Sequence, residues 1–320
     1  MFRSTGLGLG RVLLWLPLSL AAALLAALPV LAQTPVYANV AYASPSSLDT
    51  QKLDIYHPTG FGAGPYPVMM LMDGGGTSGG GREVFLGGAN GAPITAAILA
   101  RGWAVAAISY RRLTPMWPVD LNDCKAAVRF LRANAGTYNL NASAIVAWGK
   151  SGGGRLASLL ATTAGISLYD GSVGPHTGTS SAVAGAVVMF APLDWTTIYA
   201  DDNTAGCAHS ASTAQILGCT PDGATYSACL PTATEASAAL QVNAGSAPVL
   251  SMSALDYCGF RFEHYRLMDN LAAVGAPSAA VMLATGAHGD PPYYTYYAWN
   301  YVIRFLCAQG IPSGCTRTFQ

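Results

Sequence analysis

Short apolar segments alternate with helical patterns along most of this chain. Residues Pro67–Met72 form a continuous apolar run, as expected for a strand that is buried on both faces of a sheet. In Val119–Ala133 the apolar residues recur at helical spacing. Strands separated by helices of this length form βαβ units, so the pattern predicts an α/β fold with a mostly parallel central sheet and helices on both faces.

Comparable patterns predict the other elements. We expect further strands at Lys52–Tyr56, Trp103–Tyr110, Ala144–Trp148, Val183–Phe190, Val249–Ser253 and Ser278–Leu283. We expect further helices at Pro93–Arg101, Leu156–Leu160, Phe262–Val274 and Ala298–Leu306. The pattern dissolves over about residues 193–247, which are rich in Ala, Thr, Ser, Gly and Cys. We interpret this stretch as a small cap or lid, built of short helices and inserted between two core strands.

Residues 1–32 have the features of a secretory signal peptide. Arg3 and Arg11 precede an uncharged apolar stretch at residues 12–31, and small residues ending at Ala32 provide a cleavage site. The stretch is long enough to span a bilayer, so a retained membrane anchor is the alternative. Two prolines interrupt it and favour cleavage after Ala32.

The remaining residues, 33–320, are enough for one large α/β domain. The net charge is zero, only 10% of the residues are charged, and no basic run follows the leader. We therefore expect no nucleic-acid partner, because binding to nucleic acid needs clustered Lys and Arg. The export signal predicts a secreted or periplasmic protein with no stable membrane anchor after cleavage.

Export also places the seven cysteines in an oxidising compartment, where disulfides are expected. Cys307 and Cys315 are close in sequence and could staple the last turn of the fold. Cys124 lies inside an amphipathic helix, and we predict it to be the unpaired cysteine of this odd number. The pairing of the others stays open, since sequence does not fix connectivity; they are Cys207, Cys219, Cys229 and Cys258. The chain has no C-x-x-C pair, so no thiolate metal site is expected.

The segment Gly149–Gly153 carries one serine, Ser151, between glycines. The apolar run Ala144–Trp148 precedes it and a helical pattern, Leu156–Leu160, follows. This is the G-x-S-x-G pattern of a strand, a tight turn and a helix, in which the backbone holds the serine hydroxyl exposed above a sheet. The pattern predicts Ser151 as a nucleophile.

A serine hydroxyl needs a base within hydrogen-bond reach and a third group that orients the base. Asp256 follows the expected strand Val249–Ser253, and His288 follows Ser278–Leu283, so both lie at the edge of the sheet that carries Ser151. We predict His288 as the base and Asp256 as its partner. His288 could instead be a surface residue of a Gly-rich loop, and Asp256 could merely cap the helix that follows. The fallback acids are Asp269 and Asp290.

Glycines also follow the buried strand Pro67–Met72, in the sequence Asp73-Gly74-Gly75-Gly76. Backbone N–H groups at a strand end can form an oxyanion hole, which holds the negative charge that develops during acyl transfer. We assign the N–H groups of Gly74, Gly75 and Gly152 to this role. For the glycines further along, at residues 77–81, a flexible loop is the alternative interpretation.

Aromatic residues near the expected catalytic edge could line a substrate pocket. Trp195 follows the strand Val183–Phe190, and Trp117 lies beside Met116 before a helix. The aromatic cluster at residues 293–299 is a further candidate. Aromatic side chains near such loops also serve simply to pack, so both interpretations stand.

With these residues placed, the chain resembles the α/β-hydrolase superfamily. The chain is most similar to hormone-sensitive-lipase-like carboxylesterases and to relatives that act on acetylated or feruloylated polysaccharides. The resemblance extends over about Leu53–Phe305 and includes Leu53–Pro58, Ser109-Tyr110-Arg111 and Pro118–Ala133. It implies the catalytic order Ser, acid, His that Ser151, Asp256 and His288 follow.

Two residues depart from the pattern of that superfamily. Asp73 stands where lipases and esterases carry the His of His-Gly-Gly-Gly, and Lys150 replaces a His that often precedes the nucleophile. The strands that end at these residues are neighbours in this fold. We therefore expect an ion pair that fixes the loop Asp73–Gly76, called the oxyanion loop below, against the turn Gly149–Gly153, called the elbow. Two unrelated solvent-facing charges are the alternative.

Together these features predict an exported serine carboxylic-ester hydrolase that works through a Ser-His-Asp triad and an acyl-enzyme. No metal ion and no organic cofactor is implied, and the expected partner is a small-molecule or polymeric ester. A serine peptidase of the prolyl-oligopeptidase type is an alternative, although the chain has no segment large enough for a β-propeller. A non-catalytic binding protein is another, in which Asp73 has spoiled the hole. The sequence does not choose among acetyl, feruloyl, lipid or polyester substrates.

Overall fold

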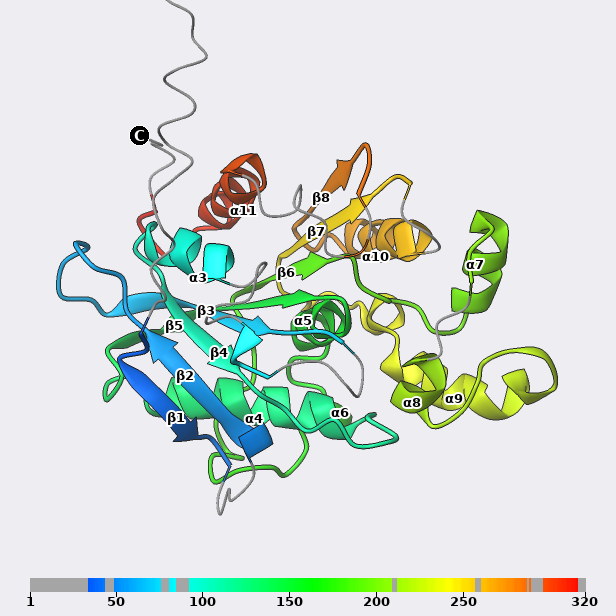
Figure 1. Cartoon of the computed structure of the whole chain (residues 1–320), viewed down its shortest axis with the longest axis horizontal. Coiled ribbons are helices and arrows are strands. Elements are labelled where there is room, and N and C mark those ends of the chain that lie inside the picture. Colours follow the sequence, from blue (N-terminus) through cyan, green and yellow to red (C-terminus); the bar gives the residue numbers. More distant parts are fainter. Residues whose placement is uncertain are drawn as a thin grey trace, which may run out of the picture. The chain divides into compact units, whose positions relative to one another are not determined.

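An eight-stranded sheet organises the described part of the chain, in the order β1-β2-β4-β3-β5-β6-β7-β8 (Figure 1). The computed structural model describes residues 34–43, 49–75, 81–84, 92–208, 212–256, 260–286, 288 and 296–315. The strands are β1 (Tyr37–Ala41), β2 (Lys52–Tyr56), β3 (Tyr66–Met72), β4 (Ala104–Ile108), β5 (Leu140–Lys150), β6 (Gly185–Met189), β7 (Val249–Ala254) and β8 (Ser278–Leu283). The predicted signal peptide lies outside the described residues.

Most of the strand pairs are parallel. Strand β2 pairs antiparallel with β1 and with β4, and all pairs from β4 to β8 are parallel. In this register Met72 at the end of β3 pairs with Ile108 of β4 on one side and with Gly149 of β5 on the other. The chain segments that follow these three strands therefore emerge side by side at one edge of the sheet.

Helices cover both faces of the sheet (Figure 1). The cluster that contains α4, α5 and α10 packs on one face, and the cluster that contains α3 and α11 packs on the other. The α-helices are α3 (Ala92–Leu99), α4 (Val119–Ala133), α5 (Gly152–Thr162), α6 (Ser167–Asp170), α7 (Ile198–Ala205), α8 (Ser212–Leu217), α9 (Tyr226–Ala236), α10 (Phe260–Ala273) and α11 (Tyr296–Ala308). Short 3-10 helices are η1 (Asp49–Gln51), η3 (Gly223–Thr225) and η4 (Ala238–Gln241).

The mostly parallel sheet with helices on both faces confirms the predicted fold class. The bounds of α4 are those expected from its apolar spacing. Strand β5 begins earlier than expected, at Leu140, because Leu140 pairs with Tyr66 of β3. Strand β6 ends at Met189 rather than Phe190, because Phe190 has a φ of +35°, which lies outside the extended region.

The segment expected to form a cap contains short helices. Helices α7, α8 and α9 follow β6; α8 and α9 lie side by side, whereas α7 lies apart from them and contacts α10 (Figure 1). The backbone N–H groups of Met116 and Trp117 donate to the carbonyl of Ile216 in α8, at 3.1 and 2.9 Å. A disulfide between Cys219 and Cys229 joins the end of α8 to α9. The loop after β4 therefore contacts this segment directly.

The other cysteines behave as the sequence predicts. Cys307 and Cys315 form a disulfide, which closes the end of α11 onto the chain that follows it. Cys124 is free and buried. Cys207 is also disulfide-bonded. Among the described residues, no helix is both long enough and apolar enough to cross a membrane.

A buried ion pair joins the two helices that flank the elbow. Arg155 of α5 and Asp120 of α4 are both fully buried, and a guanidinium N–H of Arg155 donates to Oδ2 of Asp120. The other carboxylate oxygen accepts from the N–H of Leu121 at 2.8 Å. Burial raises the pKa of Asp120, and the charge of Arg155 opposes that shift. The positive charge of Arg155 therefore favours the ionised carboxylate in the core.

This pair predicts an asymmetric effect on stability. Arg155→Met leaves the buried carboxylate of Asp120 without its counter-charge, and we expect it to lower the free energy of unfolding by about 3–5 kcal/mol. The double variant Asp120→Leu/Arg155→Met removes both charges and is expected to regain most of this loss. Urea unfolding with the disulfides intact measures both values. Equal destabilisation in the single and double variants would contradict the dependence of the carboxylate on Arg155.

Candidate active site

Ser151 lies at a strained turn between β5 and α5. Its φ of 55° and ψ of −125° are unfavourable for a residue with a Cβ, and such strain concentrates at functional sites. Its N–H donates to the carbonyl of Met189 at the end of β6, at 2.9 Å. A Cβ on Gly149 would lie 1.9 Å from the carbonyl oxygen of Gly153, so the turn closes only with glycine at position 149.

His288 meets Ser151 across 137 residues of sequence. Its Nε2 lies 2.8 Å from Oγ of Ser151, which is hydrogen-bond distance. The ring edge packs against Phe190 with a centroid distance of 5.0 Å, and Phe260 of α10 lies at 6.3 Å. The imidazole is exposed on one side and braced by aromatic rings on the other.

Asp256 contacts the chain segment that carries His288. It follows β7, and its Oδ1 accepts the N–H of Gly286 at 2.9 Å, two residues before the histidine. This bond ties the loop after β7 to the loop after β8. Of the fallback acids, Asp269 is exposed on α10, and Asp290 lies outside the described residues.

Two effects favour the neutral form of His288. Removal of part of the ring from water lowers the pKa of His288, and the positive charge of Lys150 lowers it further. A neutral imidazole can accept a proton from a hydroxyl. The electrostatics therefore favour the protonation state that a general base requires.

His264 of α10 lies in a different environment from His288. It is buried, and its Nε2 accepts the N–H of Ala191 at 3.0 Å, so the ring proton sits on Nδ1 and is donated to Oγ of Ser251. Burial lowers the pKa of His264 to about 3. The adjacent Glu263 accepts the N–H groups of Leu193 and Asp194. These two side chains fix the segment after β6 and face away from solvent.

The three glycines assigned to an oxyanion hole gather beside Ser151. A Cβ on Gly74 would lie 2.6 Å from the Cβ of Ser151 and 2.7 Å from the carbonyl oxygen of Lys150. A Cβ on Gly152 would lie 3.8 Å from the Cα of Gly74, and Gly75 has a φ of +94°. The loop after β3 thus packs directly on the elbow. Gly76 lies outside the described residues.

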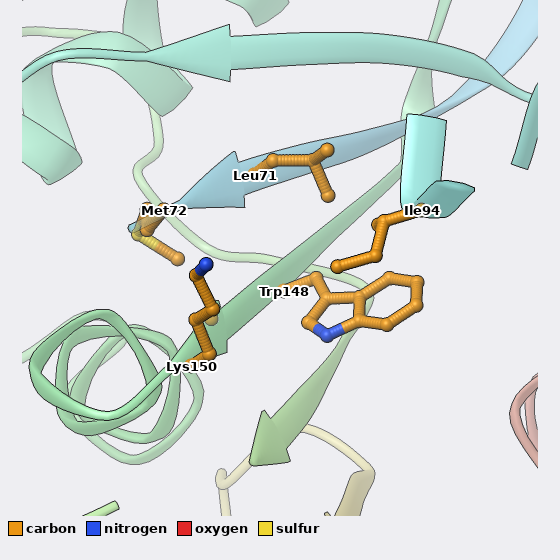
Figure 2. Close-up of a pocket in the computed structure, with 6 residues that line it drawn as sticks. Leu71, Met72, Ile94, Trp148 and Lys150 are labelled. Carbon is orange, nitrogen blue, oxygen red and sulfur yellow. The ribbon is translucent and has the colours of Figure 1, made fainter. Parts of the chain in front are cut away.

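The predicted pairing of Asp73 with Lys150 is confirmed. The Nζ of Lys150 lies 3.1 Å from Oδ1 of Asp73, and both side chains are largely buried. Figure 2 shows Lys150 extending from the end of β5 towards Met72 at the end of β3, beside a small hollow that Trp148 and Ile94 also line. The pair connects the oxyanion loop to the elbow, and the charge of Lys150 offsets that of Asp73.

The two tryptophans suggested for substrate binding lie in the core. Trp195 is 1% exposed and Trp117 is 7% exposed. Trp117 packs against Tyr169 with ring centroids 6.1 Å apart, and both belong to the cluster around α4 and α5. Their positions fit packing, so they carry no part of the function proposed below.

Two residues near the site carried no assignment from the sequence. The hydroxyl of Tyr110 donates to the carbonyl of Asp73, and a guanidinium N–H of Arg112 donates to the carbonyl of Gly74, both at 2.6 Å. One feature of the sequence could have identified Arg112 as a residue near the site. It is the second of two consecutive arginines that follow a buried strand, and a cation at that strand end needs an anionic or carbonyl partner.

The arrangement is suited to nucleophilic chemistry. A hydroxyl lies against an imidazole whose pKa is lowered, and glycine backbones converge beside the hydroxyl at the amino end of α5. The helix dipole favours negative charge at that end. An acyl group bound at Ser151 would thus place its carbonyl oxygen among N–H groups and near a helix amino terminus.

This chain is similar in sequence to a curated esterase. Esterase LipC of Mycobacterium tuberculosis is 29% identical over 147 residues, which are 45% of this chain and 34% of LipC. The chain therefore spans about a third of the length of that curated relative. The similarity extends over less than half of this chain.

Solved structures show the same fold over most of the chain. A truncated carbohydrate esterase from gut microbiota matches with a TM-score of 0.70 and 24% identity, over 87% of this chain and 97% of that one. The esterase Est2 of Thermogutta terrifontis matches with a TM-score of 0.67 and 20% identity, over 89% and 96%. An acetyl ester-xyloside bifunctional hydrolase of Caldicellulosiruptor lactoaceticus matches with a TM-score of 0.64 and 18% identity, over 81% and 89%.

These structures share the α/β-hydrolase fold with this chain. The family model BD-FAE matches residues 53–254, which hold the oxyanion loop, the elbow and strands β2 to β7. The match covers more than half of the sequence, and the chain therefore belongs to the BD-FAE family.

Proposed function

We propose that this protein is an exported serine carboxylic-ester hydrolase, with Ser151 as nucleophile, His288 as general base and Asp256 as the third member of the triad. The observation that carries the proposal is the 2.8 Å approach of Nε2 of His288 to Oγ of Ser151, at a strained turn. Membership of a family whose relatives include esterases supports the same reaction class.

The proposed reaction has two halves. His288 takes the proton of Ser151 as Oγ attacks the ester carbonyl carbon, and the N–H groups of Gly74, Gly75 and Gly152 stabilise the oxyanion. The bond to the alcohol oxygen then breaks, and His288 returns the proton to that oxygen. Water attacks the acyl-enzyme in the second half, with the same base and the same donors, and releases the acid.

The ion pair beside the hole fits this role. An unpaired carboxylate at Asp73 would repel the developing oxyanion, whereas its contact with Lys150 at 3.1 Å cancels that charge. Asp256 contributes through the loop that carries His288, and its negative charge favours the imidazolium that forms during the reaction. The pair of Asp73 and Lys150 therefore leaves no net negative charge beside the hole. Asp256 alone of these three residues favours the positive charge that forms on the imidazole.

Export is part of the proposal. Disulfides are rare in reducing compartments, and five of the six cysteines in the described ranges are disulfide-bonded. This supports a secreted or periplasmic location and a signal peptide at residues 1–32. A domain at residues 33–320 would then be the mature enzyme, with the segment at about 193–247 as its cap.

Replacement of the nucleophile is the direct test. We expect wild type to hydrolyse p-nitrophenyl acetate and Ser151→Ala to lose at least about 10³-fold in kcat/KM, because no other hydroxyl lies at the elbow. Ser143→Ala, an exposed serine in the first half of β5, is the matched control and should retain full activity. Turnover of aminoacyl anilides faster than esters would assign a peptidase instead. Equal activity of Ser151→Ala and wild type would exclude the mechanism.

Replacement of the proposed acid tests the third role. Asp256→Asn keeps an oxygen that can accept from Gly286 but removes the charge, and we expect kcat to fall by about 10²–10⁴-fold. The exposed helix residue Asp269 provides the control, and Asp269→Asn should behave as wild type. If Asp269→Asn gives the larger loss, the acid has been assigned to the wrong strand.

The pH profile tests the base. Activity needs neutral His288, and the pKa of His288 is lowered, so kcat/KM should rise with pH through a value below the ordinary pKa of histidine. Lys150→Met removes a cation that lowers this pKa, and should move the acid limb to higher pH by about 0.5 unit or more. Lys150→Arg keeps the charge and should leave the limb in place. A limb that moves to lower pH in Lys150→Met would contradict the role of Lys150.

A further inference from the structure

The loop after β3 is held from the side of β4 as well as from the elbow. The hydroxyl of Tyr110 donates to the carbonyl of Asp73 at 2.6 Å, and Nη2 of Arg112 lies 3.4 Å from the same oxygen. The Nη1 of Arg112 donates to the carbonyl of Gly74 at 2.6 Å. Both residues lie just beyond β4, which is the neighbour of β3 on the side opposite β5.

The geometry of the peptide group connects these bonds to the proposed oxyanion hole. In a trans peptide the C=O of one residue and the N–H of the next point in opposite directions in one plane. The carbonyl of Asp73 therefore fixes the direction of the Gly74 N–H, and the carbonyl of Gly74 fixes that of the Gly75 N–H. Donors that hold these carbonyls turn both N–H groups away from Tyr110 and Arg112.

The opposite side of this loop is the elbow. The Cα of Gly74 faces the Cβ of Ser151 so closely that a Cβ on Gly74 would lie 2.6 Å from it. Lys150, also from β5, holds the side chain of Asp73. The loop is thus fixed through its carbonyls on the β4 side and through a side chain on the β5 side, with the nucleophile beside it.

The side chains of Tyr110 and Arg112 are well suited to keep donating these hydrogen bonds. Tyr110 is buried, and this burial raises the pKa of its phenol, so the hydroxyl keeps its proton and donates. The guanidinium of Arg112 stacks on the ring of Tyr110 at 4.5 Å, so each side chain limits the movement of the other. A charged donor on a carbonyl also polarises the peptide group and strengthens its N–H as a donor.

We propose that Tyr110 and Arg112 are positioning residues for the reaction, because they orient and polarise the two peptide units whose N–H groups receive the oxyanion. This inference rests on the proposed function, since it assigns a role within that hydrolysis. Neither side chain is required to touch the substrate. Their loss should therefore weaken binding of the transition state and leave binding of the ground-state ester nearly unchanged.

Tyrosine variants give a matched test. Tyr110→Phe and Tyr42→Phe each remove a buried hydroxyl that donates to a backbone carbonyl, since Tyr42 donates to Ser109 at 2.7 Å. We expect both to lose similar thermal stability, whereas only Tyr110→Phe should lower kcat, by about 3–30-fold, with KM within about twofold of wild type. Equal kcat in the two variants would overturn the inference.

Arginine variants separate position from charge. We expect Arg112→Met to lower kcat by about 10–100-fold, and Arg112→Lys, which retains a cationic donor, to recover part of that loss. The oxygen of a catalytic serine adds to the carbonyl carbon of a trifluoromethyl ketone, with its proton passing to the histidine, and the adduct is a tetrahedral oxyanion. The corresponding methyl ketone instead mimics the bound ester. Arg112→Met should weaken binding of the fluorinated ketone by about tenfold or more. It should leave the affinity for the methyl ketone within about twofold of wild type. Equal weakening of both ketones would assign Arg112 to substrate binding and overturn the proposal.

The experiment distinguishes this inference from the proposed function. Wild-type ester turnover that is lost in Ser151→Ala supports the hydrolase, whatever the Tyr110 and Arg112 variants do. With that result in hand, wild-type kcat in Tyr110→Phe and Arg112→Met would overturn the positioning role alone. An unchanged acid limb of the pH profile in both variants is also expected, because neither contacts His288 in the proposed role.

Discussion

The strained backbone at Ser151 is the constraint on which the rest of the site depends. A residue with a Cβ adopts a φ of 55° and a ψ of −125° only when the surrounding structure leaves no alternative. The parallel strands on either side supply that restraint, because the N–H of Ser151 is bound to the end of β6 and Gly74 after β3 packs on its Cβ. The buried pair of Arg155 and Asp120 then ties the following helix to α4. The half-buried side chain of Ser151 keeps its position because its backbone is held at several points.

Several charged side chains surround that turn. Lys150 contacts Asp73 and lowers the pKa of His288, while Arg112 contributes a second cation on the other side of the loop. The carboxylate of Asp73 offsets the first cation. The positive charge of Arg112 lies next to the peptide units that the proposed mechanism uses for the oxyanion, so developing negative charge is favoured there.

The segment after β4 connects regions that would otherwise be independent. Arg111 pairs with buried Asp123 of α4 at 2.7 Å, Arg112 holds the loop after β3, and Met116 donates its N–H to α8 of the cap segment. A few consecutive residues therefore join the core helix, the oxyanion loop and the cap. Helix α10 gives a similar link on the other side, where Glu263 and His264 hold the segment after β6.

Local pattern determined much of this protein. Apolar runs such as Pro67–Met72 and the spacing in Val119–Ala133 predicted the sheet and its helices, because burial on one or two faces leaves a periodic trace. The glycines around Ser151 and the strand end before His288 predicted that these two residues would meet, and the parallel topology implied that Asp73 and Lys150 would pair. The catalytic roles of Ser151, Asp256 and His288 stay predictions. Tertiary structure alone decided the burial of Trp117 and Trp195, because an indole in a loop has the same local pattern whether it packs or binds. Tertiary structure also decided which carbonyls of the oxyanion loop accept hydrogen bonds from Tyr110 and Arg112. Every residue has a backbone carbonyl, so the sequence does not show which of them will be bound until the sheet brings its strand ends together.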